Sequence, residues 1–404
     1  MGKEISITDI GTFIDLPMGS SLNDRVRVAT QLEGVGELQN KMVERASNRA
    51  TDLLVASRCN ASCPFCFYNP PQKIKIDSDT VATISTSAQG LKARGDKVTL
   101  YPLEPTMVPE LLPVYTELSA DRALTNAISL TDKMLARFRE RGINKLAISL
   151  EGDRDTFCTM TGGTPQTFER VVSGIARAVE SGVSVEIFLT LGRKNLDTIE
   201  WVVNKSVELG CRSCKIFRMI PTGKAQNLPD DDFINEGDVP DILRRINKLR
   251  LQYPDFPVRL SKFGPNFFSQ NTYKQLAIGE KWPQSQYLCP AITNQFSGIL
   301  IDKEGRVESY PVFPCFQAVG FPELQTGRYD VQTGNIFSQQ WIDPDFLKER
   351  VKGKCSGCDY FEICLGDCPI TMYAEGRKKG ANDPFESGLS VCLTRTIAKI
   401  VDAS

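Results

Sequence analysis

Residues 58–68 read RCNASCPFCFY and place Cys59, Cys63 and Cys66 in a CxxxCxxC spacing. The apolar run at residues 52–57, directly before this stretch, predicts a strand. Three thiolates on one short loop can bind three irons of a four-iron cluster and leave the fourth iron open. A structural zinc site would instead be closed by a fourth protein ligand. The spacing therefore predicts an iron–sulfur cluster with one open iron, and a zinc site or a disulfide is the alternative.

The composition is that of a globular protein with balanced charge. The chain has 404 residues, of which 41% are hydrophobic, and a formal net charge of −1. This balance gives no reason to expect nucleic acid or an anionic membrane as a partner. No apolar run approaches the roughly 18 residues that span a bilayer, and residues 1–20 lack the pattern of a signal peptide. We therefore expect a cytoplasmic protein.

The counts of cysteine and histidine narrow the chemistry further. The chain contains 13 Cys and no His. Clustered Cys in a cytoplasmic protein favour metal binding over a disulfide framework. The absence of His removes the usual general base and every Ser-His or Cys-His nucleophilic site. A metal must therefore be bound by thiolates, and proton transfer must use Asp, Glu, Lys, Tyr or Cys.

Strand-like and helix-like stretches alternate from about residue 52 to residue 220. Strands are predicted at residues 52–57, 98–103, 123–128, 145–150, 184–191 and 214–220. Amphipathic helices are predicted at residues 132–141, 167–181 and 196–209, and each is followed by a glycine. Six successive βα units predict an α/β fold with a partial (β/α)6 TIM-like barrel, whose chemistry lies at the C-terminal ends of the strands.

The alternation stops after Ile220, and seven of the 13 Cys lie in the last part of the chain. We therefore predict four regions. They are an N-terminal extension at residues 1–48, the barrel at residues 49–225, a connecting region at residues 226–288 and a cysteine-rich iron–sulfur domain at residues 289–404.

The triad, with Phe65 before its last cysteine, resembles that of the radical S-adenosylmethionine (SAM) superfamily. In this family the open iron of a 4Fe–4S cluster binds the amino and carboxylate groups of SAM. The resemblance implies reductive cleavage of SAM to a 5′-deoxyadenosyl radical that abstracts a substrate hydrogen. It also implies an electron donor of the flavodoxin or ferredoxin type, and it makes Phe65 a candidate cofactor contact.

Two further stretches resemble the SAM-binding segments of this family. Where the family has Gly-Gly-Glu-Pro after the second strand, residues 102–105 read PLEP, so Glu104 is the candidate ligand of the SAM amino group. Residues 147–152 read AISLEG, which makes Ser149 a second candidate SAM contact. The alternatives are a solvated loop carboxylate and an ordinary strand hydroxyl.

Other strand ends carry weaker signals. Thr125-Asn126 matches the third strand of the family, and residues 221–224 resemble the loop that passes near the adenine. Arg193 and Arg218 lie near strand ends. Each is a candidate to face a carboxylate of SAM or substrate, with a surface charge as the alternative.

Residues 354–369 read KCSGCDYFEICLGDCP and contain four Cys in a CxxCxxxxxCxxxC spacing. Together with the other C-terminal Cys they resemble the SPASM extension of radical SAM enzymes, which binds one or two auxiliary iron–sulfur clusters. The resemblance assigns Cys355, Cys358, Cys364 and Cys392 to one cluster and Cys289, Cys315 and Cys368 to the other. A zinc ribbon is the alternative, although it needs paired CxxC knuckles and only one is present.

Two departures from the SPASM pattern concern the second of these clusters. Tyr310 stands where the family commonly has a Cys after the hairpin glycine, and the nearest cysteine is Cys315. No Cys lies just before Cys289, where some members place a fourth ligand. These absences predict an iron that is open to substrate, water or a ligand other than Cys.

Three cysteines fall outside these clusters. Cys211 and Cys214 form a CxxC at the entry to the sixth strand, and Cys158 stands alone. We interpret Cys211 and Cys214 as a buried structural pair, with a redox or substrate-thiol role as the alternative.

The resemblance leaves three reaction classes open, since a fold does not fix a substrate. The first is modification of a peptide by a thioether or carbon–carbon crosslink, and the second is oxidation or rearrangement of a small molecule such as an aminoglycoside or a sugar. The third is sulfatase maturation, which is disfavoured because Phe316 stands where sulfatase maturases carry an Asp. We expect the first class.

The residues before the triad are too few for the leader-binding domain that many peptide-modifying members carry there. Either a separate leader-peptide-binding protein brings the peptide, or the substrate is small. An electron-transfer or scaffold protein would explain the C-terminal Cys. It would not explain an open triad combined with Glu104 and Ser149 on a barrel.

Overall fold

The computed structural model describes most of the barrel and parts of the C-terminal region. The described residues are 50–68, 74–263, 296–301, 309–338, 342–358, 361, 365–366, 368–386, 388, 390–392 and 395–396, with the backbone of 3–7 and 11–15. Two predicted cluster ligands, Cys289 and Cys364, lie outside the described residues. Near the N-terminus, β1 (Lys3–Ile7) and β2 (Gly11–Asp15) pair antiparallel.

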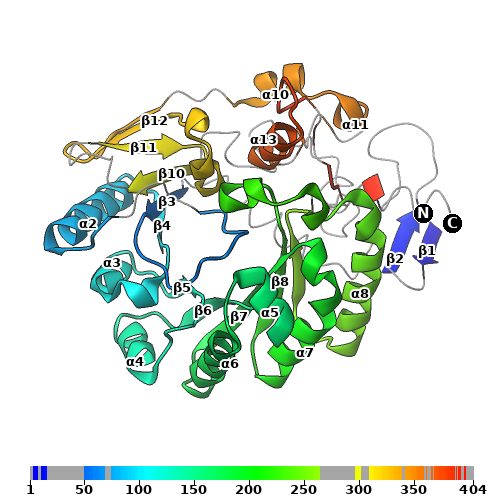
Figure 1. The fold of residues 1–404 in the computed structure, drawn as a ribbon. Coiled ribbons are helices and arrows are strands. Elements are labelled where there is room, and N and C mark those ends of the chain that lie inside the picture. Colours follow the sequence, from blue (N-terminus) through cyan, green and yellow to red (C-terminus); the bar gives the residue numbers. More distant parts are fainter. Residues whose placement is uncertain are drawn as a thin grey trace.

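The predicted α/β architecture is confirmed, and each of the six predicted strands is present. They are β3 (Ala50–Val55), β4 (Lys97–Pro102), β5 (Arg122–Thr125), β6 (Lys145–Ser149), β7 (Ser184–Leu191) and β8 (Ser213–Arg218). The helices between and after them are α2 (Ser78–Ala93), α3 (Leu112–Glu117), α4 (Asp132–Glu140), α5 (Arg154–Thr161), α6 (Pro165–Glu180), α7 (Ile199–Glu208) and α8 (Val239–Gln252). The helices lie outside the strands, as in a barrel (Figure 1).

The strand β9 and the parallel pairing of β10 with the barrel were not predicted from the sequence. β9 (Val258–Ser261) pairs with β8, and β10 (Phe296–Ile301) pairs with β3. β10 also pairs antiparallel with β11 (Ser309–Phe313), which leads to β12 (Gly327–Asp330) and β13 (Ile336–Ser338). The C-terminal region therefore continues the sheet of the barrel, while the predicted domain boundaries remain a prediction.

The strands form two sheets, in the order β13-β12-β11-β10-β3-β4 and β5-β6-β7-β8-β9. β4 and β5 are the end strands of these sheets, so backbone hydrogen bonds of the described strands do not close the barrel at this point. Hydrogen bonds of the Glu104 side chain to Thr125 and Asn126 join the ends of the two strands instead.

Local signals explain why α6 forms where it does. Thr164 caps its start by accepting a hydrogen bond from the Thr167 amide, and Pro165 occupies the first turn, where no amide donor is needed. After the helix, Gly182 has a φ of +81°, a conformation that glycine adopts without steric cost. The helix buries Val171, Ile175 and Ala178 at the spacing of one helical face.

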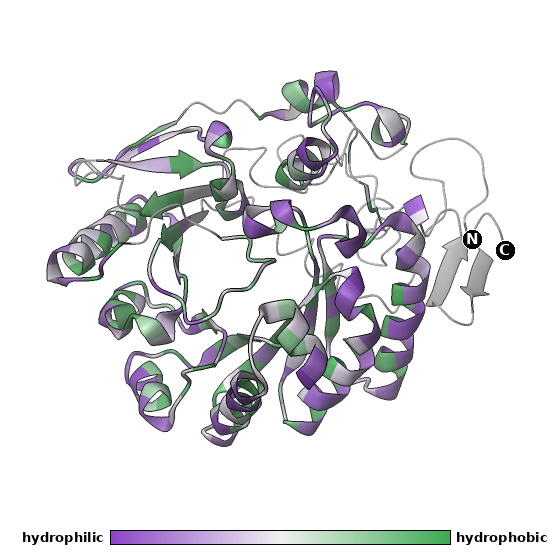
Figure 2. Ribbon diagram, viewed as in Figure 1, coloured by the Kyte–Doolittle hydropathy of each residue, from purple (hydrophilic) through white to green (hydrophobic). Residues whose placement is uncertain are grey.

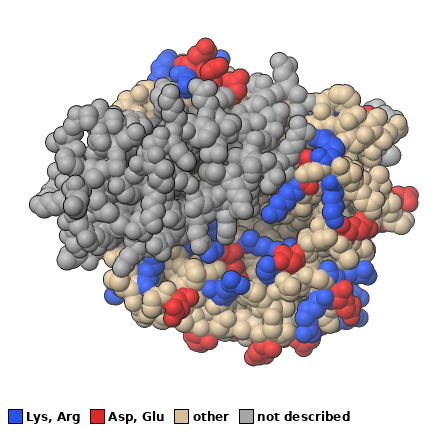
Figure 3. Space-filling view, turned by 180° about the vertical axis from the view of Figure 1, so that it is seen from behind, with Lys and Arg blue, Asp and Glu red and all other residues tan. Residues whose placement is uncertain are grey.

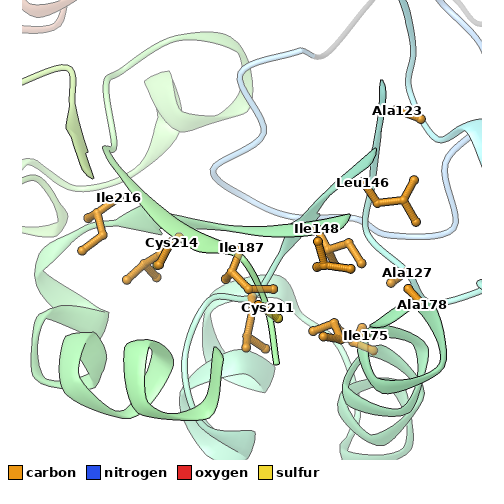
Figure 4. Packing of buried hydrophobic residues seen from close by; sticks show 14 of the residues in the cluster. Ala123, Ala127, Leu146, Ile148, Ile175, Ala178, Ile187, Cys211, Cys214 and Ile216 are labelled. Atoms are coloured by element: carbon orange, nitrogen blue, oxygen red, sulfur yellow. The ribbon is translucent and has the colours of Figure 1, made fainter. Parts of the chain in front are cut away.

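The buried face of α6 packs against strands β6 and β7. Ile175 and Ala178 face Ile148 and Ile187, and Cys211 and Cys214 lie in the same apolar layer (Figure 4). Cys214 is 0% exposed, and burial raises the pKa of the Cys211 thiol to about 12. These positions agree with the interpretation of the two as a buried structural pair.

Polar residues cover most of the outer surface of the described helices. The outward faces of the helices are largely hydrophilic (Figure 2), and on the described part of the rear face Lys and Arg alternate with Asp and Glu (Figure 3). Among the described residues, no helix has the length and apolarity that crossing a membrane requires.

Replacing Cys214 by Ser tests its structural role. The hydroxyl would lie in an apolar layer, so we expect the free energy of unfolding to fall by about 1–3 kcal/mol. Urea denaturation measures this loss. The matched control, Cys158→Ser at a half-buried position on α5, should have a smaller effect. Equal losses in the two variants would contradict the assignment of Cys214 to the core.

Candidate active site

The three cysteines of the triad share one loop that follows β3. Cys59, Cys63 and Cys66 are all partly exposed. The amide of Cys66 donates to the Cys63 carbonyl (3.2 Å), and the amide of Ala61 donates to the Cys59 Sγ atom (3.4 Å). The loop therefore follows the C-terminal end of a barrel strand, where the fold predicts chemistry, and contains a turn between Cys63 and Cys66.

The electrostatics of the triad fit cysteines that coordinate iron ions. The pKa of Cys63 is raised to about 12, mainly by burial and also by the charges of Glu151, Cys66 and Cys59. Clustered thiols disfavour one another's ionised form, whereas a metal ion reverses this preference and deprotonates a coordinating thiol. Three ionised thiols at the triad are therefore favourable only when they coordinate a metal such as iron.

Two other strand ends contact the triad loop. Asn126, after β5, donates from Nδ2 to Asn60 Oδ1 (2.8 Å) and to Cys59 Sγ (3.6 Å). The amide of Lys224, after β8, donates to the Cys66 carbonyl (2.8 Å). A Cβ atom at Gly223 would lie 2.4 Å from this carbonyl oxygen, so only glycine fits there. Whether residues 221–224 contact an adenine remains a prediction.

Glu104 follows β4 and is 1% exposed. Its Oε1 atom accepts hydrogen bonds from the hydroxyls of Thr106 (2.7 Å) and Thr125 (2.6 Å) and from the Thr106 amide (3.1 Å). Its Oε2 atom accepts from the amide of Asn126 (2.8 Å). Burial raises the pKa of Glu104 and these hydrogen bonds oppose the rise. The carboxylate thus joins the ends of β4 and β5, and its role as a SAM ligand remains a prediction.

Ser149 is half-buried at the end of β6, and a second buried carboxylate follows it. Glu151 is 2% exposed and accepts a hydrogen bond from the Thr190 amide (2.7 Å), while burial raises its pKa to about 8. We did not predict Glu151 from the sequence. The signal was present, because an acidic residue stands directly after an apolar strand in AISLEG.

The two candidate arginines lie in different environments. Arg193 pairs with Asp238 (3.2 Å) and is 40% exposed, so it is a surface charge. Arg218 is buried, pairs with Glu375 (2.6 Å) and donates from Nε to the carbonyl of Lys262 (2.6 Å). Arg218 therefore connects the barrel to the C-terminal region.

Cys315 and Cys368 lie close together in the C-terminal region, and both are buried. The pKa of Cys315 is raised to about 12 by burial and by the charge of Cys368, and Lys262 opposes the rise. Gln317 Oε1 lies 3.8 Å from Cys368 Sγ. The pair that the SPASM resemblance assigns to one cluster is therefore brought together, although the roles as ligands remain predictions.

A second group contains Cys355, Cys358 and Cys392. The amide of Cys358 donates to the Cys355 carbonyl (3.0 Å), and Arg395 Nη1 donates to Cys355 Sγ (3.4 Å). Burial raises the pKa of Cys392 to about 11; the Arg395 charge opposes this rise, and the charges of Cys355 and Cys358 add to it. Within the described residues, no three Cys, His, Asp or Glu form a site for a single metal ion.

Aromatic rings connect the triad loop to the Cys315 segment. Phe67 and Phe316 meet edge to face, with ring centroids 5.4 Å apart, and Tyr101 stacks on Phe316 at 6.1 Å. Phe65, a predicted cofactor contact, is half-buried on the triad loop. Phe316 thus packs between the two candidate cluster sites.

Comparison with known proteins identifies a family for the barrel. Residues 53–205 match the family model of the radical SAM superfamily. The AdoMet-dependent heme synthase of Methanosarcina barkeri (strain Fusaro / DSM 804) is 24% identical over 264 residues, which are 62% of this chain and 69% of that protein. The PqqA peptide cyclase of Ruegeria pomeroyi is 26% identical over 353 residues, which are 81% of this chain and 84% of that protein.

Solved structures share the fold over nearly the whole chain. Streptococcus suis SuiB bound to the precursor peptide SuiA has a TM-score of 0.61 and 15% identity, covering 88% of this chain and 79% of SuiB. The enzyme anSMEcpe with bound AdoMet and the Cp18Cys peptide has a TM-score of 0.60 and 14% identity, covering 87% of this chain and 96% of that one. At these identities the likeness establishes the fold.

Replacing Glu104 by Gln tests the link between β4 and β5. The amide nitrogen of Gln cannot accept the hydrogen bond from Asn126, so we expect the free energy of unfolding to fall by about 1–3 kcal/mol. Urea denaturation measures the change. Glu117→Gln is the control, because this carboxylate is exposed on α3. A stability of Glu104→Gln equal to that of the control would disprove the link.

Replacing Glu151 by Gln tests its raised pKa. Glu151 has a folded pKa of about 8, against 4.5 ordinarily, so the folded state binds its proton more tightly. The stability of the native protein should then fall as pH rises from 4.5 to 8, by up to about 1.4 kcal/mol per pH unit. Gln does not titrate, so Glu151→Gln should lose this slope.

The measurement is urea denaturation at pH 5 and pH 8. All proteins compared carry the change of Cys59, Cys63 and Cys66 to Ala. The triad then binds no iron, so loss of iron from it cannot contribute to the measured pH dependence. Parallel pH dependence with and without Glu151→Gln would show that the carboxyl is already ionised at pH 5.

Proposed function

Since the chain is a radical SAM enzyme, we propose that its substrate is a peptide, in which it forms a thioether or carbon–carbon crosslink. The observation that carries this proposal is the fold, which follows that of peptide-bound SuiB over 88% of the chain. The match to PqqA peptide cyclase also extends over 81% of the chain, well beyond the radical SAM domain.

The residues of the barrel suit SAM binding. Cys59, Cys63 and Cys66 would hold a 4Fe–4S cluster, which with SAM supplies the 5′-deoxyadenosyl radical for hydrogen abstraction. Gly223 lets the loop after β8 approach the triad loop, and Asn126 donates toward Cys59. Glu104 and Ser149, at neighbouring strand ends, are the proposed contacts to SAM.

The C-terminal cysteines suit auxiliary clusters. Cys315 and Cys368, with Cys289, would hold one cluster, and Cys355, Cys358, Cys364 and Cys392 would hold another. Such clusters can accept the electron that remains on a product radical or bind a substrate thiolate. Both roles fit crosslinking of a peptide. We further propose a flavodoxin- or ferredoxin-type protein as electron donor, and a separate leader-peptide-binding protein.

A tetrapyrrole is the second candidate substrate. Three AdoMet-dependent heme synthases match the chain, and the Fe-coproporphyrin III synthase of Methanosarcina barkeri (strain Fusaro / DSM 804) reaches 26% identity over 81% of it. Sulfatase maturation is disfavoured, because Phe316 packs on Phe67 and Tyr101 where sulfatase maturases carry an Asp.

The first test is formation of 5′-deoxyadenosine from SAM. The protein is purified without oxygen, reconstituted with iron and sulfide and reduced with dithionite. We expect deoxyadenosine from the wild type and none after Cys59, Cys63 and Cys66 are changed to Ala. That variant should keep roughly half or more of its iron, because the C-terminal thiolates are unchanged. Cys158→Ala is the control and should retain activity.

The substrate class is tested in the same assay. Short peptides encoded beside the gene and Fe-coproporphyrin III are each added to the reconstituted enzyme, and products are analysed by mass spectrometry. A peptide that loses two hydrogen atoms on crosslinking supports the proposal. Turnover of Fe-coproporphyrin III alone would replace it with the tetrapyrrole function.

A further inference from the structure

Lys262 lies directly after β9 and reaches the pair Cys315 and Cys368. Its Nζ atom donates to Gln317 Oε1 (2.8 Å) and lies 3.7 Å from Cys368 Sγ. Its charge also favours the ionised form of Cys315. A cation from the barrel is thus placed within hydrogen-bonding range of a candidate cluster ligand in the C-terminal region.

The backbone of Lys262 adopts an unfavourable conformation. Its φ is +68°, a value that residues with a Cβ atom rarely adopt. Such conformations persist where the surroundings hold them and concentrate at functional sites. Here Arg218 donates from Nε to the Lys262 carbonyl (2.6 Å). Arg218 in turn pairs with Glu375 (2.6 Å), and the side chains are 1% and 6% exposed.

The contacts among Lys262, Arg218 and Glu375 form a closed ring with the helix that follows Cys368. Glu375 belongs to α13 (Pro369–Lys378), and Cys368 is the N-cap residue of that helix. The helix that begins at Cys368 therefore holds Arg218 through Glu375, and Arg218 holds the backbone of Lys262. The ring holds the backbone of Lys262 to α13, and the hydrogen bond to Gln317 Oε1 directs the Lys262 ammonium group toward the Cys368 sulfur.

We propose that Lys262 is a positioning residue that raises the reduction potential of the auxiliary cluster bound by Cys315 and Cys368. The inference rests on the proposed function, which assigns these thiolates to a cluster. Reduction adds negative charge to a cluster, and hydrogen bonds to its sulfurs and nearby positive charge favour the reduced form. Lys262 thereby makes this cluster the better electron acceptor.

The test is a redox titration of the auxiliary clusters, followed by electron paramagnetic resonance. All proteins carry the change of Cys59, Cys63 and Cys66 to Ala, so that only C-terminal clusters give signals. Lys262→Met removes the charge and keeps the length of the side chain. Lys262→Gly removes the charge and fits the positive φ, and Lys262→Arg keeps the charge.

The control is Lys378→Met. Lys378 lies on α13, pairs with Asp230 (3.2 Å) and donates to the Leu228 carbonyl (2.6 Å), away from the cysteines. It changes the net charge by the same amount as Lys262→Met.

We expect Lys262→Met and Lys262→Gly to lower the midpoint of one cluster signal. At the original midpoint the ratio of reduced to oxidised cluster should fall about tenfold, which is about 59 mV for a one-electron couple. Lys262→Arg and Lys378→Met should leave the midpoint near its original value. Midpoints that do not move in Lys262→Met and Lys262→Gly, or an equal shift in Lys378→Met, would overturn the inference.

The iron content of the starting variant separates a failure of the proposed clusters from a failure of the role of Lys262. If the starting variant of Cys59, Cys63 and Cys66 bound no iron after reconstitution, the C-terminal thiolates would hold no cluster. The assignment of auxiliary clusters would then be wrong before Lys262 is changed. Iron that is retained with a potential independent of Lys262 rejects only the role of Lys262.

Discussion

The buried carboxylate of Glu104 joins the two halves of the barrel where backbone pairing stops. β4 and β5 end their respective sheets, and two of the four hydrogen bonds of Glu104, those from Thr125 and Asn126, connect the residues after β4 with the end of β5. One of these bonds comes from the amide of Asn126, whose side chain reaches Cys59. The link that closes the barrel therefore also sets the position of a group beside the triad. A change at Glu104 must affect both stability and the cluster site.

The triad loop is held from two further directions. The amide of Lys224 binds its backbone from the end of β8, and Phe67 packs on Phe316, the residue after Cys315. The first candidate cluster site is thus packed against the segment that carries the second. Because β10 pairs with both β3 and β11, the sheet joins the same two regions. The barrel and the C-terminal region are therefore parts of one packed unit, and a substrate bound between them would contact both.

The sequence predicted what depends on local pattern. The six strands, the glycine stops and the triad follow from periodicity and spacing, and the grouping of the C-terminal Cys followed from family resemblance. β9, and the place of β10 beside β3, were missed because each strand is stabilised by a parallel partner distant in the chain. Lys262 and Glu151 were also missed, because their environments depend on the folded structure. Lys262 is distinguished by its contact with Cys368, which only the tertiary structure creates, whereas the position of Glu151 directly after an apolar strand was visible in the sequence but its burial was not.

The charged residues near the triad differ in sign from those near the C-terminal cysteines. Two buried carboxylates, Glu104 and Glu151, lie at the strand ends near the triad, where SAM would bring a sulfonium and an ammonium group. Burial raises the pKa of both, and a bound cation would favour their ionised forms. Each C-terminal Cys group instead has a cation, Lys262 beside Cys368 and Arg395 beside Cys355. Thiolate-bound clusters are anionic, so at the proposed auxiliary clusters these cations would offset charge that burial would otherwise penalise. This chain, which has no His, thus places acidic groups where SAM would be positive and basic groups where auxiliary clusters would be negative.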